Sequence, residues 1–174
     1  MQRRLNAEQL AQQAAGVRLA VFDVDGVLTD GGLVFNHEGQ ESKRFHAHDG
    51  LGLKRLMRAG FEVAVITARS SEVVRIRMAE LGIGHLYQGE SDKLSCLQGL
   101  CQRLNLDLDQ ACYTGDDAPD RACMKAVRLA FSVADATDDA LEVAHWVTSR
   151  GGGQGAVRQI CDLLIASQSP SISP

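Results

Sequence analysis

The sequence lacks the features that mark membrane and secreted proteins. Its 174 residues contain no apolar run near the roughly 20 residues that a bilayer-spanning helix needs. The N-terminal ten residues lack the hydrophobic core of a secretory signal. The net charge of −4 argues mildly against a nucleic-acid partner, because a net basic field that captures phosphate backbones is missing. We therefore expect neither a membrane nor a nucleic acid as partner.

The five cysteines form neither a CxxC pair nor a metal-ligand spacing. They are odd in number, and most have apolar neighbours: Cys96, Cys101, Cys112, Cys123 and Cys161. Buried free thiols of this kind are typical of a reducing compartment, and a zinc site built from them is not expected. Together with the missing signal, they predict a cytoplasmic protein.

What the sequence does contain is a regular alternation of apolar runs and helical patterns, which predicts one domain spanning residues 1–174. Helices of this length between strands favour an α/β fold: a Rossmann-like, doubly wound parallel sheet with helices on both faces. An added N-terminal helix is expected at about 6–15, and a polar, flexible tail at about 168–174. Strands are expected at 17–25, 61–68, 85–88, 111–115, 129–133 and 145–148, and helices at 49–59, 70–81, 92–104, 119–127, 138–144 and 155–167.

One segment, at about 26–48, breaks the alternation. The turn residues of 36–39 predict a small β-hairpin flap, too short to be a lid domain. Because the flap emerges beside Asp25, it should project next to any site there. A two-stranded ribbon is marginally stable alone, so we expect it to pack on another subunit.

Two carboxylates, Asp23 and Asp25, end the first apolar run. Residues two apart in a strand face the same side, and open α/β sheets bind ligands at the carboxyl ends of their strands. Carboxylates held this close repel each other unless a cation or a proton lies with them. The pair therefore predicts a functional site.

Polar residues also follow the later strands, and together they suit a phosphate ester. Mg²⁺ prefers oxygen ligands, which Asp23 and Asp116 would supply. Asp23 could attack phosphorus, while Asp25 protonates the leaving oxygen and later activates water. Thr67 and Lys93 would hold the phosphoryl oxygens.

Each signal also has an ordinary explanation when taken alone. A DxD pair occurs in surface turns, and the Asp116-Asp117 run suits a solvated loop or a helix N-cap. Lys93 alone would be a surface lysine, and Thr67 alone would cap a helix. Their joint position at the strand ends favours the functional interpretation.

These residues together resemble the four motifs of the haloacid dehalogenase-like phosphatases. The matching motifs are Asp23-x-Asp25-Gly-x-x-Thr29, Thr67, Lys93 and Gly115-Asp-Asp-x-x-Asp120. The resemblance implies that Asp23 is the nucleophile and that Asp25 is the general acid/base, whose backbone carbonyl also binds Mg²⁺. It makes Asp116 the third metal ligand, and gives Asp117 and Asp120 a supporting role.

Three further segments, 45–53, 81–89 and 152–158, are similar to the small capless subgroup that dephosphorylates 3-deoxy-D-manno-octulosonate 8-phosphate, a lipopolysaccharide precursor. This similarity implies a phosphorylated sugar acid as substrate. It also implies a homotetramer in which the flap and tail of neighbours help to close each site. The implied substrate-binding residues are His46, Ala47, His48, Asp49, Gly50, Lys54, Arg69, Arg77 and Lys93.

Some alternatives stay open at this point. Arg77 could instead form a helix-face salt bridge with Glu80, and His46 and His48 could be ordinary loop residues. Two departures, His48 where many relatives carry arginine and Ala68 where glycine is common, affect substrate preference. A nine-carbon sialic-type acid phosphate is an alternative substrate. A catalytically silent tetramerisation module or a phosphate-responsive binding protein is the alternative outside enzymes.

Overall fold

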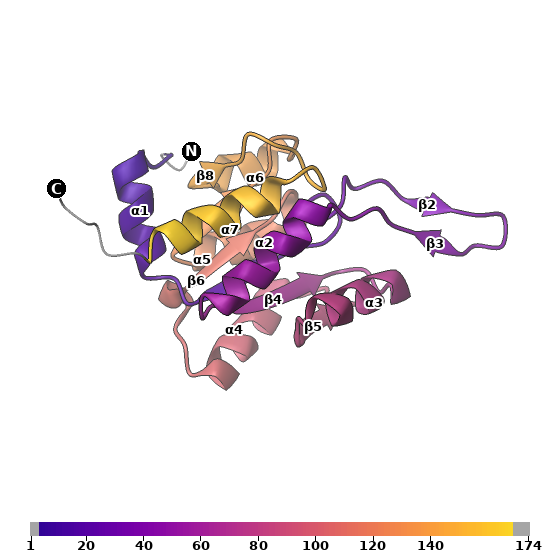
Figure 1. The fold of residues 1–174 in the computed structure, drawn as a ribbon, viewed down its shortest axis with the longest axis horizontal. Coiled ribbons are helices and arrows are strands. Elements are labelled where there is room, and N and C mark those ends of the chain that lie inside the picture. The colour runs from indigo at the N-terminus through magenta and orange to yellow at the C-terminus, as the bar shows by residue number, and fades with distance from the viewer. Residues whose placement is uncertain (1–3, 169–174) are drawn as a thin grey trace.

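A six-stranded parallel sheet, in the order β5-β4-β1-β6-β7-β8, forms the centre of the molecule (Figure 1). The structure is a computed structural model and describes residues 4–168. The strands of the sheet are β1 (Leu19–Phe22), β4 (Glu62–Thr67), β5 (His85–Gln88), β6 (Ala111–Thr114), β7 (Leu129–Ser132) and β8 (Trp146–Val147). The doubly wound α/β architecture expected from the alternating pattern is confirmed, because helices cover both faces.

The two faces of the sheet bury separate apolar clusters. In β1, Ala20 and Phe22 face one cluster while Leu19 and Val21 face the other, as the period of two in a strand requires. The helices on the Phe22 side are α1 (Ala7–Ala15), α2 (Ala47–Arg58), α3 (Glu72–Leu81) and α7 (Ala156–Ala166). Those on the Val21 side are α4 (Lys93–Leu104), α5 (Arg121–Ala126) and α6 (Asp138–Val143). Short 3₁₀ turns, η1 (Leu108–Gln110) and η2 (Ala118–Asp120), precede β6 and α5.

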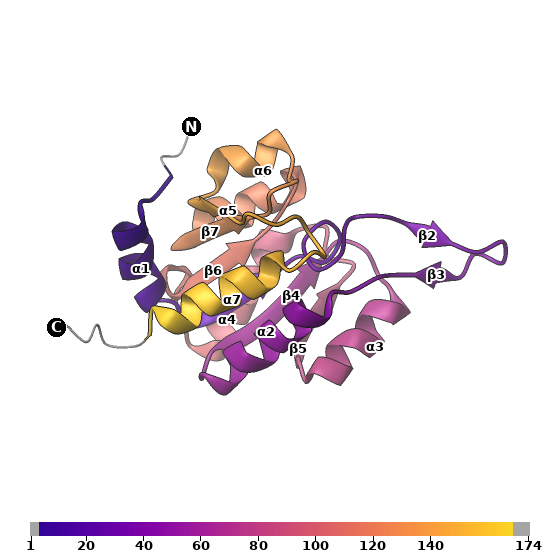
Figure 2. The same cartoon turned by 45° about the horizontal axis from the view of Figure 1, so that its top comes forward.

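The strand order brings the predicted site residues to one edge. Strand β1 lies between β4 and β6, with Phe22 in register with Val65 and Thr114. The carboxyl ends of these three strands are therefore neighbours, and they lie at the end of the molecule from which the hairpin projects (Figure 2). The chain adds β4 and β5 on one side of β1, and then β6, β7 and β8 on the other side. Open α/β sheets form ligand crevices at such a change of side, which here falls between the neighbouring strands β1 and β6.

The predicted flap is a two-stranded antiparallel ribbon that extends away from the body (Figures 1 and 2). It consists of β2 (Val34–Phe35) and β3 (Glu41–Ser42). Its turn is held by the Asn36 side chain, whose Oδ1 accepts hydrogen bonds from the backbone of Glu38 and Gln40 at 3.0 and 2.9 Å. Three consecutive apolar residues of the ribbon are more than half exposed: Leu33, Val34 and Phe35.

The element boundaries mostly match the expectations from sequence. The N-terminal helix is present, with Asn6 and Gln9 forming a capping box. Helix α2 begins at Ala47, two residues before the expected start at 49, because the His46 side chain accepts a hydrogen bond from the backbone of His48 and caps it. All five cysteines are free and four are buried. Most of the expected tail, 169–174, lies outside the described residues.

Among the helices of residues 4–168, none combines the length and the apolar character needed to cross a bilayer.

Candidate active site

Asp23 lies at the bottom of the site, directly after β1. Its side chain is buried, with one oxygen accepting from the Val24 backbone N–H at 2.7 Å and the other lying 2.8 Å from the Lys93 ammonium. The Lys93 side chain enters from the first turn of α4 and is itself 3% exposed. A carboxylate oriented in this way by a backbone amide and a lysine is suited to nucleophilic attack.

Asp120 organises the opposite wall of the site. Its Oδ1 accepts from Lys93 Nζ at 2.8 Å and from the Tyr113 hydroxyl at 2.9 Å. Its Oδ2 accepts from the backbone N–H groups of Asp116 and Asp117 at 3.1 and 3.4 Å. Both oxygens are thus occupied by donors, so Asp120 fixes the lysine and the loop after β6.

Asp117, also expected to support the site, ties the same loop to the start of α6. Its Oδ1 accepts from the Ala118 backbone and from the Thr137 hydroxyl, each within 3.0 Å. Thr137 also donates its backbone N–H to the carbonyl of Asp116, and this carbonyl and Asp117 Oδ1 share the one proton of the Thr137 hydroxyl. The Asp116 side chain is left free to face the cleft.

The surroundings of Gly26 explain why a glycine, and no larger residue, follows Asp25. Its φ is +86°, and a Cβ built there would lie 2.1 Å from Asp116 Oδ2. The loop after β1 can therefore approach Asp116 only with glycine at this position. Gly152 meets the same loop from the other side, because a Cβ on it would lie 1.9 Å from the Gly26 carbonyl oxygen.

Three carboxylates, those of Asp23, Asp116 and Asp120, offer oxygen atoms within 4.8 Å of one another. Burial and the Asp120 charge raise the pKa of Asp23 to about 6, outweighing the attraction of Lys93. Burial and the charges of Asp120, Asp23 and Asp117 raise the pKa of Asp116 to about 7. Burial alone would lower the pKa of Lys93, but Asp23 and Asp120 raise it. The crowding of negative charge that Lys93 does not neutralise fits a divalent cation held by the two less occupied carboxylates, Asp23 and Asp116.

The cleft above these residues has a volume of about 310 Å³. Asp23, Lys93, Asp116 and the β4-end residues Thr67 and Arg69 line it. The four residues with a predicted catalytic role therefore lie in one cleft: Asp23, Asp25, Thr67 and Lys93. Arg69, for which only substrate binding was predicted, lines the same cleft.

Asp25 lines the same cleft but makes contacts that are not evident from the sequence. Its carboxylate pairs with Lys43, from the stem of the flap, and lies 3.5 Å from Arg69 Nε. Glu41 binds the same two cations, at 3.3 Å from Lys43 Nζ and 3.0 Å from Arg69 Nη2. It also accepts from the Ser71 hydroxyl, which together with Arg69 and Lys43 lowers the pKa of Glu41. The signal in the sequence is the pair of opposite charges at Glu41 and Lys43, two residues apart where the flap returns toward the site.

The other predicted substrate-binding residues lie apart from the cleft within this chain. Asp49 is buried, and its carboxylate accepts from the backbone N–H groups of Gly155 and Arg158 at the start of α7. Arg77 pairs with Glu80 at 2.8 Å, as the alternative interpretation had it, and lies 5.9 Å from the centre of the Phe45 ring. Asp49, Gly50 and Arg77 line a very small cavity under the first turn of α2.

The remaining predicted substrate residues belong to the same part of α2. His46 lines an open hollow of about 370 Å³ with residues of the loop before α7, and its ring lies 5.0 Å from that of His48. Ala47 and His48 are exposed, and Lys54 is half-buried one turn and more along the helix. The substrate contacts of all these residues stay predictions.

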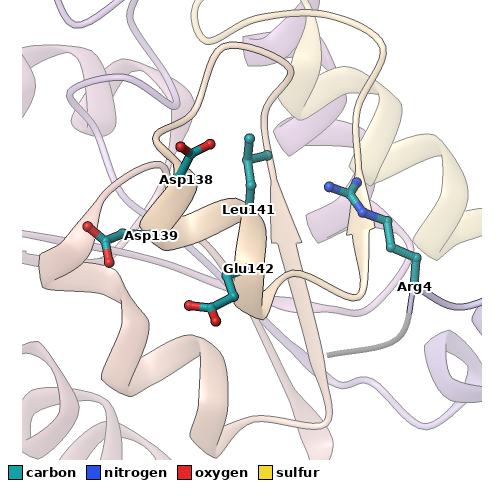
Figure 3. Close-up of a pocket in the computed structure, with 5 residues that line it drawn as sticks. All are labelled: Arg4, Asp138, Asp139, Leu141 and Glu142. Atoms are coloured by element: carbon teal, nitrogen blue, oxygen red, sulfur yellow. The ribbon is translucent and has the colours of Figure 1, made fainter. Parts of the chain in front are cut away.

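A larger hollow, of about 560 Å³, lies between α6 and the N-terminal segment (Figure 3). Arg4 and Leu141 line it with three acidic residues of α6: Asp138, Asp139 and Glu142. The three carboxylates point in different directions rather than toward one point (Figure 3). Arg121 binds two of them, those of Asp139 and Glu142. The hollow has none of the convergent chemistry of the Asp23 cleft.

The α/β fold and the cleft of carboxylates and Lys93 are those of a hydrolase that acts on phosphate esters. Comparison with known proteins agrees with this class. The family model for haloacid dehalogenase-like hydrolases matches residues 72–160. The 3-deoxy-D-manno-octulosonate 8-phosphate phosphatase of Yersinia pestis is 43% identical over 162 residues, covering 93% of this chain and 87% of the relative. That of Escherichia coli K12 is 42% identical over 164 residues, covering 94% and 87%.

A crystal structure of the corresponding phosphatase of Moraxella catarrhalis, in complex with magnesium ion, phosphate ion and KDO, superimposes with a TM-score of 0.92. It is 40% identical, and the match covers 94% of each chain. The chain belongs to the 3-deoxy-D-manno-octulosonate 8-phosphate phosphatase family of haloacid dehalogenase-like hydrolases.

Proposed function

We propose that this protein hydrolyses 3-deoxy-D-manno-octulosonate 8-phosphate to the free sugar acid and inorganic phosphate. The observation that carries the proposal is the cleft in which Asp23, Lys93 and Asp116 converge at adjacent strand ends. The substrate comes from the relatives, whose names specify it at 42–43% identity over more than nine-tenths of this chain.

In the proposed reaction, Asp23 attacks the phosphorus and forms an aspartyl-phosphate. Asp25 gives a proton to the departing C8 oxygen and later takes one from the attacking water. Lys93 lies between Asp23 and Asp120 and would neutralise the phosphoryl oxygens, and Thr67 would donate to them from the end of β4.

Asp23 and Asp116 would hold the Mg²⁺, with the backbone carbonyl of Asp25 as the third protein ligand. The bound cation would offset the charge of the carboxylates and of the phosphate dianion, so that nucleophile and substrate can approach each other. Asp120 would keep Asp116 in place through the hydrogen bond that its carboxylate accepts from the Asp116 backbone N–H.

Phosphate release from 3-deoxy-D-manno-octulosonate 8-phosphate, with Mg²⁺ and with EDTA, tests this function. A nine-carbon sialic-type acid 9-phosphate and a panel of other sugar phosphates serve as comparisons. The proposal expects metal-dependent turnover with the highest kcat/KM on the eight-carbon acid, and none by the Asp23→Asn variant. Equal kcat/KM across the panel would remove the assigned substrate, and no turnover of any member would favour the silent tetramerisation module.

We also propose that the chain acts as a homotetramer in the cytoplasm, with the flap packed on a neighbouring subunit. The exposed apolar residues Leu33, Val34 and Phe35 support this, because they form a contiguous ribbon surface that the chain's own core does not cover. Light scattering should give a mass four times that of the 18.8 kDa chain. A Val34→Asp, Phe35→Ser double variant should dissociate, and a wild-type monomer would contradict the proposal.

A further inference from the structure

Asp25, Lys43, Glu41 and Arg69 form a closed ring of alternating charge at the edge of the cleft. Lys43 contacts the carboxylates of both Asp25 and Glu41, and Arg69 does the same from the other side. Each charge therefore has two opposite charges as neighbours, and the ring is neutral as a whole. Two of its members belong to the flap stem and two to the strand ends of the sheet.

The burial of the members differs in a way that separates their roles. The Lys43 side chain is 1% exposed, whereas those of Asp25 and Arg69 are 21% and 43% exposed and line the cleft. Removing a lysine ammonium from water costs free energy, which opposite charges nearby must offset. For Lys43 these charges are the carboxylates of Asp25 and Glu41. Lys43 thus contacts Asp25 but is not among the residues that line the cleft.

The two oxygens of Asp25 are held unequally. Oδ1 forms the close contact with Lys43, while Oδ2 has only the 3.5 Å approach of Arg69 Nε. Oδ2 is therefore the oxygen that can exchange Arg69 for the leaving-group oxygen of a substrate and carry the proton that is transferred, while Oδ1 stays fixed by accepting from Lys43. A carboxylate that pivots freely would lose the alignment on which proton transfer depends.

Glu41 fixes the position of Lys43 and Arg69 in turn. It is anchored to the start of α3 through the Ser71 hydroxyl, which also caps that helix. The Glu41 contact ties the flap stem to the body of the molecule independently of the exposed ribbon tip.

Resting on the proposed function, we infer that Lys43 is a positioning residue for proton transfer by Asp25, and that Glu41 holds it in place. The prediction specific to this role is a dependence on the leaving group. A sugar alkoxide needs a proton as it departs, whereas p-nitrophenolate leaves readily without one. The ratio kcat/KM reports the steps up to departure of the leaving group, so the later attack of water does not affect it.

The test compares wild type with Lys43→Met on 3-deoxy-D-manno-octulosonate 8-phosphate and on p-nitrophenyl phosphate. We expect kcat/KM to fall by roughly 10- to 100-fold on the sugar phosphate and by less than about threefold on the aryl ester. Asp25→Asn should show the same selectivity with a larger loss. Lys125→Met removes the same charge from an exposed position on α5, and should leave both values within about twofold of wild type.

Equal losses on the two substrates, or no loss on either, would overturn the inference. Turnover of the aryl ester also reports that Asp23 and the fold are intact in the variant. Should Lys43→Met fail to fold, Lys43→Arg, which keeps a cation facing Asp25, must retain the sugar-to-aryl ratio within about threefold of wild type for the inference to stand. If wild type does not prefer the eight-carbon acid, the proposed substrate fails but ribose 5-phosphate or any other turned-over alkyl phosphate serves the same comparison.

Discussion

Removing the metal should destabilise this protein by an amount that depends on pH, because the site concentrates carboxylates. The pKa of Asp23 is raised from 3.8 to about 6 and that of Asp116 to about 7 when no cation is bound. A raised pKa for an acid means that the folded state holds its proton more tightly than the unfolded state. The metal-free protein should therefore lose stability as the pH rises from about 4 through about 7, and the full penalty should be present above that range.

The size of the penalty follows from the shift of Asp23, whose side chain is 11% exposed. One pKa unit corresponds to about 1.4 kcal/mol, so this shift represents about 3 kcal/mol at pH 8. The shift of Asp116 arises partly from the same repulsion and is not added to it. For a chain of this size, 1 kcal/mol changes Tm by about 2–4 °C, which gives about 6–12 °C.

The assay is a set of thermal melts at pH 5, 6, 7 and 8, each with saturating MgCl₂ and with EDTA. The quantity compared is the difference in Tm between the two conditions at one pH, which cancels the pH dependence of the rest of the molecule. We expect this difference to grow by about 6–12 °C from pH 5, where protons compete with the metal, to pH 8, where they do not.

Asp116→Asn is the matched control, because it removes one of the crowded charges without changing the size of the side chain. In EDTA at pH 8 it should melt above wild type, and its gain from Mg²⁺ should largely disappear. A Mg²⁺-dependent gain that is the same at pH 5 and pH 8, or one that survives intact in Asp116→Asn, would refute the argument.

Three further substitutions test individual contacts. Gly26→Ala should lower kcat/KM by roughly 100-fold or more, since its Cβ would displace Asp116; activity near wild type would show that the loop can move aside. Asp120→Asn should lower the free energy of unfolding by about 1–3 kcal/mol, measured by urea titration, because an amide cannot accept all four hydrogen bonds; an unchanged midpoint contradicts this. Asp49→Asn should cost about 1–2 kcal/mol in the same titration, because one amide N–H at the start of α7 loses its acceptor, and it fails if stability is unaffected.

The strand ends of the sheet were predictable because the periodicity of the sequence decides them. Six runs could be assigned to strands, and parallel strands present their carboxyl ends at one edge. Placing Asp23, Thr67, Lys93 and Asp116 in one cleft needed nothing beyond that edge. The sequence shows that Gly26 follows the Asp pair, but the approach of Gly26 to Asp116 depends on the neighbouring strand β6.

The contacts between distant segments were not predictable in the same way. Asp120 is three residues beyond Asp117, but its four hydrogen-bond donors come from α4, β6 and its own loop. Lys43 is 18 residues from Asp25, and only the path of the flap stem decides whether it turns toward the cleft or toward solvent. Such contacts depend on the geometry of a loop, for which the sequence has no periodic signal.

The division between the two sets of predicted residues has a consequence for specificity. The residues assigned to the chemistry converge within one chain, whereas His46 and Arg77 face other hollows of the same chain and His48 is exposed on the first turn of α2. Recognition of the sugar by those residues thus requires a cleft from another copy to lie against the start of α2. The flap stem binds Asp25 in the cleft, and the flap tip exposes Val34 and Phe35, which we propose to pack on another copy. The flap therefore links the catalytic cleft of one chain to its contact with a second chain. A dissociated variant should accordingly keep turnover of p-nitrophenyl phosphate while losing its preference for the sugar acid, and a monomer that retains this preference would show that one chain completes the site alone.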